Sequence, residues 1–253
     1  MPATRSLLEP LDLMLPALPQ GLNGLRLAHL SDLHVRKTDR RFDRLLSRLA
    51  ASRLDLLLLT GDYQDRSAPP EAALALLERL ATEVKPTLGL FGIWGNHDSA
   101  ELREASLDLP ICGGIHDEDA DSVPLAMSVA ALEDQAEAGE KPASRLRLLL
   151  AHHPHQLVTA ADLGADLMFC GHTHGGQIRI PPGIPVHHGS DLPLNMAAGL
   201  LRCRDTLGVI SRGLGESHLR LRLACPRQAI VCTLRTGPRP GARTDGIDLI
   251  RAW

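Results

Sequence analysis

The chain has 253 residues, a formal net charge of −3 and an isoelectric point near 6.4. A chain of this length can bury a substantial core, and its charge carries no electrostatic signature of a dedicated nucleic-acid-binding protein. Aromatic residues make up only 2% of the sequence, so stacking platforms for bases are scarce. The core must therefore consist mainly of Leu, Ala, Val and Ile.

The sequence shows no break in composition, internal repeat or low-complexity linker that would divide it. We predict a single domain over residues 1–253, with a core at about 24–235, an N-terminal flank at 1–23 and a C-terminal tail at 236–253. The stretch from Leu7 to Leu18 predicts an edge strand, and peripheral contact with a membrane surface is the alternative. The tail is expected to run over the surface. No window reaches the roughly 18 apolar residues that a membrane span needs.

Five short apolar runs predict buried strands: LRLAHL, LDLLLLT, TLGLFGIW, LRLLLA and ADLMFC. Helical patterns lie between them. One helix carries Phe42, Leu45, Leu46 and Leu49 behind a cap at Thr38 or Asp39, and others are expected between Pro70 and Pro86, from Ser99, and from Pro154 to Gly164. Alternating strands and helices indicate an α/β fold with helices outside. After residue 175, GVISRGLG and AIVCTLRT predict further strands and a second sheet packed on the first.

The five cysteines form an odd set without a CxxC motif. A secreted disulfide framework is usually even and more densely spaced, so reduced thiols and a cytoplasmic location are expected. Cys170, at the end of an apolar run, is interpreted as a small buried hydrophobic residue.

Each of the five predicted strands ends in a polar cluster of metal-ligand type. Ligands bind beyond the carboxyl ends of strands in α/β sheets, so all five clusters are expected to converge on one rim. Asp32 and His34 stand two apart at the end of an extended run, so their side chains leave the same face, and His172 and His174 repeat this spacing. The clusters are Ser31-Asp32-Leu33-His34, Gly61-Asp62, Gly95-Asn96-His97-Asp98, His152-His153 and Gly171-His172-Thr173-His174.

A buried carboxylate at Asp62 costs several kcal/mol unless cations neutralise it. Seven candidate ligands exceed what one ion can use, but they suit two ions that share a bridging carboxylate. The mixture of imidazole and carboxylate favours Mn, Fe or Zn over Ca or Mg. The predicted metal ligands are Asp32, His34, Asp62, Asn96, His152, His172 and His174.

The motifs D-x-H, GD, GNHD, a strand-end His and GHTH, in this order, resemble the calcineurin-like metallophosphoesterase superfamily. The resemblance covers most of the chain, and GHTHGGQ and SRGLG resemble a bacterial branch of phosphodiesterases and phosphohydrolases. It implies a four-layer αββα sandwich and two divalent or trivalent metal ions. It places Asp32, His34, Asp62 and His174 on the first ion and Asp62, Asn96, His152 and His172 on the second. It also implies that His97 is no ligand but protonates the leaving oxygen, with Asp98 orienting it through the other ring nitrogen.

We therefore predict a hydrolase that cleaves a phosphodiester or pyrophosphate linkage in a small substrate with metal-activated water. A broad phosphomonoesterase and a metal-dependent nuclease share the same site and remain the enzymatic alternatives. A binding or scaffold member of the superfamily is the alternative outside catalysis, and the completeness of the ligand set argues against it.

Overall fold

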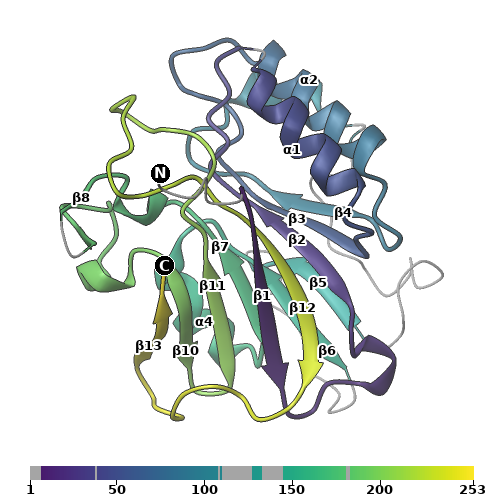
Figure 1. The fold of residues 1–253 in the computed structure, drawn as a ribbon, viewed down its shortest axis with the longest axis vertical. Helices are drawn as coiled ribbons and strands as arrows, with labels where there is room; N and C mark the ends of the chain where they lie inside the picture. The colour runs from purple at the N-terminus through teal and green to yellow at the C-terminus, as the bar shows by residue number, and fades with distance from the viewer. Residues whose placement is uncertain (1–6, 38, 108, 110–126, 133–144, 181–182) are drawn as a thin grey trace, which may run out of the picture.

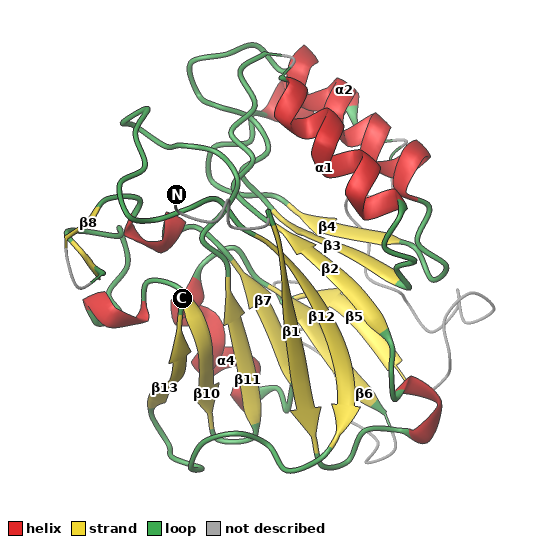
Figure 2. Ribbon diagram, in the orientation of Figure 1, coloured by secondary structure: helices red, strands yellow, loops and turns green. Residues whose placement is uncertain are grey.

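Among the described residues of the computed structural model, eleven strands form two large sheets, and two more form a small ribbon (Figures 1 and 2). The structure describes residues 7–37, 39–107, 109, 127–132, 145–180 and 183–253. The first sheet has the order β1 (Leu8–Leu15), β12 (Ala229–Thr236), β2 (Arg26–Leu30), β3 (Leu56–Thr60) and β4 (Leu90–Ile93). The second has the order β13 (Ile247–Ala252), β10 (Gly199–Cys203), β11 (Thr206–Ile210), β7 (Leu167–Cys170), β6 (Leu146–Leu150) and β5 (Met127–Ala131). The ribbon pairs β8 (Arg179–Ile180) with β9 (Ile184–Pro185).

The helices begin and end close to where the sequence predicts them. The Asp39 side chain caps α1 by accepting a hydrogen bond from the Arg41 N–H at 2.9 Å, and Ser99 caps α3 in the same way. The α2 helix continues into a π-helical turn, η2. The helices are α1 (Arg40–Ala50), α2 (Glu71–Arg79), η2 (Leu80–Val84), α3 (Ala100–Ala105) and α4 (Leu157–Asp162), with short 3-10 turns η1 (Gln20–Leu22), η5 (Pro154–Gln156), η6 (His174–Gly176) and η7 (Leu194–Met196).

Three hydrophobic clusters define four layers, which confirms the predicted αββα arrangement. Leu58 on β3 and Phe169 on β7 belong to a cluster that both sheets share, so the sheets pack face to face. A second cluster joins the outer face of the first sheet to α1 and α2, which Figure 2 shows lying over β2, β3 and β4. A third joins the outer face of the second sheet to α4 through Leu157 and Ala160.

Both ends of the chain take part in the sheets. β1 pairs in parallel with β12 at the edge of the first sheet, and its residues Leu11, Leu13 and Leu15 are buried, which confirms the predicted edge strand. Residues 236–253 include no buried residue, as expected for a tail that runs over the surface, but the sequence did not predict that they contain β13, which pairs with β10 along the edge of the second sheet. The sequence pattern did not indicate this strand because the segment before it, residues 237–246, is rich in Gly, Pro and Arg.

The second sheet also contains strands that the sequence pattern assigned to the first. β6 and β7 lie in the second sheet, whereas β12 returns to the first and pairs antiparallel with β2. Apolar periodicity identifies buried strands but carries no information on which sheet a strand joins. The five polar clusters therefore follow strands of two different sheets.

Among the described residues, no helix is long and apolar enough to cross a membrane. The cysteines that the structure describes are free and buried, and Cys170 is fully buried, as expected for a small hydrophobic residue. A short acidic run, Asp117-Glu118-Asp119-Ala120-Asp121, lies outside the described residues.

Candidate metal centre

All nine predicted site residues lie just beyond the carboxyl ends of strands. Asp32 and His34 follow β2, and Asp62 follows β3. The turn Gly95-Asn96-His97-Asp98 follows β4, His152 follows β6, and His172 and His174 follow β7. Backbone hydrogen bonds join these turns: the Asp32 N–H donates to the Gly61 carbonyl, and the His172 N–H donates to the Asp32 carboxylate, both at 3.0 Å. The two sheets thus present their clusters to one another.

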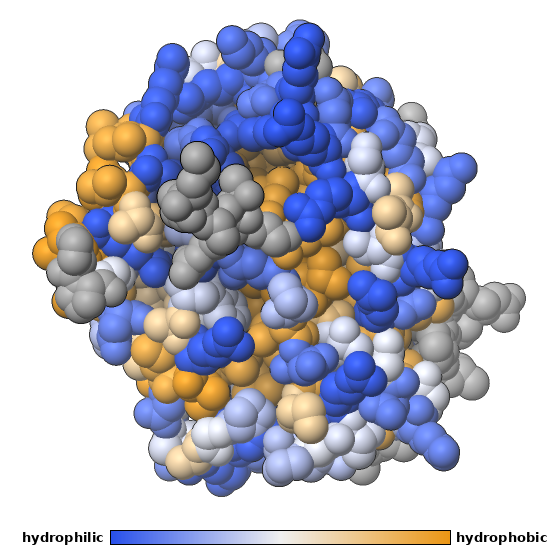
Figure 3. All heavy atoms as spheres, viewed as in Figure 1, coloured by the Kyte–Doolittle hydropathy of each residue, from blue (hydrophilic) through white to orange (hydrophobic). Residues whose placement is uncertain are grey.

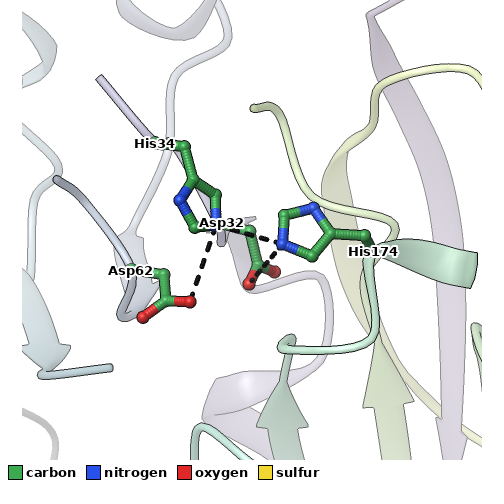
Figure 4. Close-up of side chains that lie close together, drawn as sticks. All are labelled: Asp32, His34, Asp62 and His174. Carbon is green, nitrogen blue, oxygen red and sulfur yellow. Dashed lines mark hydrogen bonds and ion pairs between the residues drawn. The ribbon is translucent and has the colours of Figure 1, made fainter. Parts of the chain in front are cut away.

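Four buried side chains form a first group: Asp32, His34, Asp62 and His174. Figure 4 shows them pointing toward one another, and one ligand-type atom of each lies within 4.8 Å of all the others. The Nε2 atoms of His34 and His174 are 3.0 Å apart. His34 Nε2 is 3.5 Å from Asp62 Oδ2, and His174 Nε2 is 3.6 Å from Asp32 Oδ1.

A second group adjoins the first and shares Asp62 with it. His152 Nε2 lies 3.4 Å from the same Asp62 Oδ2 atom and 3.1 Å from Asn96 Oδ1. His172 Nδ1 lies 3.1 Å from Asn96 Oδ1 and 3.3 Å from His152 Nε2. One carboxylate oxygen of Asp62 therefore stands between the two groups.

Hydrogen bonds on the far side of two imidazoles determine which ring nitrogens carry protons. His152 Nδ1 lies 2.7 Å from the Thr60 carbonyl, and His172 Nε2 lies 3.2 Å from the Gly189 carbonyl. A carbonyl oxygen only accepts, so each of these nitrogens carries the hydrogen. In neutral rings, His152 Nε2 and His172 Nδ1 then direct lone pairs at each other across 3.3 Å. A cation at this point, whether a proton or a metal ion, removes the repulsion.

The pKa values of the buried groups also indicate that positive charge stabilises this site. Burial, together with the charge of Asp62, raises the pKa of Asp32 to about 7. Burial alone would lower the pKa of His152, but its hydrogen bond to Asp62 and the charges of Asp62 and Asp32 raise it to about 9. The partners His152 and His34 hold the pKa of Asp62 below its usual range against the effect of burial. Without a metal, the group retains protons that bound metal ions would displace.

Five of the site residues have left-handed backbone conformations, with φ between 41° and 68°. They are Asp32, His34, Asp62, His172 and His174. Such conformations are unfavourable for residues with a Cβ and are concentrated at functional sites. The turns tolerate close approach only because glycines face the carboxylates: a Cβ on Gly171 would overlap the Asp32 carboxylate, and one on Gly95 would overlap the Asp62 carboxylate.

Asp98 does not orient His97 in the described structure, which differs from the expectation. Its two carboxylate oxygens accept hydrogen bonds from the backbone N–H groups of Asp62, Tyr63, Gln64 and Gly95, at 2.7–3.1 Å. His97 Nδ1 is buried and has no hydrogen-bond partner among the described residues. Asp98 therefore fastens the β3 turn to the β4 turn.

His97 stands beside the first group. Its ring packs edge-on against that of His34 at a centroid distance of 4.8 Å, and its backbone N–H donates to Asp62 Oδ1 at 2.8 Å. Burial lowers the pKa of His97, and the charge of Asp62 opposes this effect.

Two further residues, Arg222 and His218, reach the site without having been singled out in the sequence, and His153 lies there as well. Arg222 is half-buried, and its Nη2 lies 3.3 Å from His174 Nδ1. The ring of His153 lies against that of His172 at 4.1 Å, and the ring of His218 lies 6.0 Å from that of His97. No spacing pattern marks Arg222 or His218. His153 follows the predicted ligand His152 directly and is not itself among the predicted ligands.

The family model for the calcineurin-like phosphoesterases matches residues 25–176, a span that contains all nine site residues. Phosphodiesterase YaeI of Escherichia coli (strain K12) is 34% identical over 190 residues, covering 68% of this chain and 67% of the relative. The uncharacterized metallophosphoesterase YkoQ of Bacillus subtilis (strain 168) is 27% identical over 216 residues, covering 79% of each. UDP-2,3-diacylglucosamine pyrophosphatase LpxG of Chlamydia muridarum (strain MoPn / Nigg) is 27% identical over 234 residues, covering 69% of this chain and 70% of the relative.

The substitution Asp98→Asn tests whether the Asp98 carboxylate holds the turns after β3 and β4 together. Burial and the charge of Asp62 raise the pKa of Asp98 to about 6, so its carboxylate is ionised at pH 7.5. An amide would turn N–H groups toward backbone N–H groups, and we expect the free energy of unfolding to fall by about 2–4 kcal/mol. Urea unfolding of the metal-free protein measures this change. A variant that keeps wild-type stability and loses only turnover would restore the role of orienting His97.

Proposed function

Because the chain belongs to the calcineurin-like phosphoesterase family, which implies a hydrolase, we propose that it hydrolyses a phosphodiester or pyrophosphate linkage with water activated by two metal ions. The observation that carries the proposal is the pair of ligand groups that share Asp62 Oδ2, at 3.5 Å from His34 Nε2 and 3.4 Å from His152 Nε2. Two ions about 3.5–4 Å apart commonly share a ligand in this way in phosphoryl-transfer enzymes.

The residues present fit such ions in number and chemistry. Asp32, His34 and His174 would hold the first ion, Asn96, His152 and His172 the second, and Asp62 both. Imidazole and carboxylate ligands together favour Mn, Fe or Zn. When bound, such ions lower the pKa of water and neutralise phosphate oxygens. The carbonyls of Thr60 and Gly189 keep the far nitrogens of His152 and His172 protonated, so their near nitrogens are free to bind metal.

His97 is the residue that we propose to act on the leaving oxygen. It follows Asn96 directly, its ring lies against His34, and it is half-buried at the edge of the first group. An imidazole at this position can donate a proton to the oxygen that leaves phosphorus.

The preference for a diester or pyrophosphate is supported by relatives. One relative is named a phosphodiesterase and another a pyrophosphatase of UDP-2,3-diacylglucosamine. GHTHGGQ and SRGLG resemble the same bacterial branch. A cytoplasmic location and a single domain remain predictions.

The number of ions is tested by elemental analysis after metal loading. We expect close to two equivalents of Mn²⁺ per chain, since seven ligand-type residues exceed the needs of one ion. Asp62→Asn should weaken both sites because it removes the shared oxygen, whereas Asn96→Ala should remove mainly one equivalent. Asp65→Asn is the matched control, because Asp65 caps a turn at Ser67 and pairs with Arg36 outside both groups. One equivalent that persists in excess Mn²⁺ would contradict the two-ion proposal.

The role of His97 is tested by His97→Ala. We expect turnover to fall by about 10²–10⁴-fold while the metal content stays near that of the wild type. The loss should be smallest for a nitrophenolate leaving group, which needs little protonation. His155→Ala is the control, since His155 is an exposed histidine outside both groups. Equal losses for good and poor leaving groups would reduce His97 to positioning the phosphate, and loss of metal would make it a ligand.

The substrate preference is tested by comparing kcat/KM for bis-nitrophenyl and mono-nitrophenyl phosphate at equal Mn²⁺. The proposal predicts faster hydrolysis of the diester, and the Asp62→Asn variant shows how much activity comes from this site. A monoester preference of more than about tenfold, or roughly 1.4 kcal/mol in transition-state binding, would place the chain among broad phosphatases instead.

A further inference from the structure

Large exposed apolar side chains gather in one region beside the metal-ligand groups. Among the described residues, seven of the nine side chains of this kind lie there, and the other two, Leu107 and Val158, lie elsewhere. We call this set the apolar rim. It consists of Ile180, Ile184, Val186, Leu194, Leu219, Leu221 and Leu223, whose exposed fractions range from 44% to 60%.

Two stretches that are distant in sequence build most of the apolar rim side by side, and η7, which carries Leu194, contacts β9. Ile178 bridges to Leu223, with the Arg179 N–H donating to the Leu223 carbonyl at 2.9 Å. The side-chain amide of Gln177 donates to the carbonyls of Ser217 and Leu219 at 3.1 and 2.7 Å. Figure 3 shows the resulting apolar surface as orange groups along the left edge of the molecule, over β8 and the loop that precedes β12.

Two leucines of the apolar rim, Leu221 and Leu223, flank an arginine that is anchored in the protein. Leu219, Leu221 and Leu223 alternate with arginines, and the Arg222 guanidinium turns inward. It donates to the carbonyls of Gly215 and Arg212, both at 2.7 Å. Exposed leucines that are held in place in this way form a preorganised apolar surface, and contiguous surfaces of this kind mark interaction sites.

The apolar rim lies next to the metal-ligand groups along the chain and through contacts. Its ribbon follows directly after His174, and the Gly189 carbonyl beyond the ribbon accepts a hydrogen bond from His172. On the other stretch, His218 precedes Leu219 and lies against His97. Whatever covers the rim therefore lies next to the site.

Charge favours an anionic lipid surface as the partner. The two stretches, 178–189 and 217–224, contain three arginines and no aspartate or glutamate, and Asp191 lies near Leu194. The guanidinium groups of Arg179 and Arg222 donate to backbone carbonyls of the protein. Arg220 is exposed among the leucines. A second copy of the chain would bring identical arginines together without an opposing carboxylate from these stretches. Anionic headgroups would complement Arg220, while the leucines and isoleucines enter the acyl boundary.

We propose that the apolar rim docks the protein onto an anionic lipid bilayer and holds the metal-ligand groups at the level of the headgroups. Docking itself does not depend on catalysis. Its consequence rests on the proposed function: the substrate would be a phosphoester carried in, or released at, the membrane surface. The N-terminal stretch, where the sequence left membrane contact open, is instead an edge strand with a buried face.

Flotation with vesicles tests docking without any measurement of hydrolysis, so its failure is distinct from failure of the proposed function. We expect the wild-type chain to float with phosphatidylglycerol-containing vesicles and to bind pure phosphatidylcholine vesicles less. The triple substitution Leu219→Ser, Leu221→Ser and Leu223→Ser should lower partitioning about tenfold or more. Arg220→Glu should lower it about tenfold for anionic vesicles only.

Controls separate the rim from general effects. Val158→Ser removes an exposed apolar side chain on α4 and should float like the wild type. If the triple variant does not fold, Ile184→Ser with Val186→Ser tests the ribbon independently. Absence of flotation by the wild type, or equal losses in the Val158 variant, would overturn the proposal. So would a dimer that the rim substitutions convert to a monomer without any vesicle binding, because the rim would then be a subunit interface.

Discussion

The structure depends on two buried carboxylates that lie close together where the two sheets meet. Asp32 is fully buried and Asp62 is 2% exposed. Two anions in such a place cost several kcal/mol unless cations compensate them. Without metal ions, His152 supplies part of this compensation by taking up a proton, since its pKa rises to about 9, and burial raises the pKa of Asp32 to about 7. The same carboxylates and imidazoles offer oxygen and nitrogen ligands to metal ions. The residues that require positive charge are therefore also the residues that could bind it.

The backbone around the carboxylates is also unfavourable by itself. Five site residues occupy left-handed conformations, and the turns approach one another so closely that only glycine fits at Gly95, beside Asp62, and at Gly171, beside Asp32. The face-to-face packing of the sheets offsets this strain, since it buries large apolar side chains from both. Asp98 adds four hydrogen bonds from backbone N–H groups of the turns after β3 and β4. Packing and these hydrogen bonds keep the turns in conformations that the backbone preferences of the residues alone would not favour.

The sequence predicts the layers, the helices and the strand-end position of the site, because apolar periodicity and polar turns are local signals. It does not predict the partition of strands between sheets or the β13 pairing, which depend on contacts between distant segments. The i, i+2 spacing led to the correct expectation that Asp32 and His34 face one site, but for a different reason. The prediction assumed extended backbone, whereas both residues have positive φ. The contact of Arg222 with His174 spans 48 residues and has no signature in the sequence.

Arg222 contacts the first ligand group and lies within the segment that carries three leucines of the apolar rim. Its guanidinium lies 3.3 Å from His174 Nδ1, and together with burial and His34 its charge keeps the pKa of His174 well below the usual value. The same guanidinium holds carbonyls of Arg212 and Gly215 and thereby fixes the segment that carries Leu221. Leu221 and Leu223 flank Arg222 and are exposed. The arginine that contacts the ligand group therefore also anchors this part of the apolar rim.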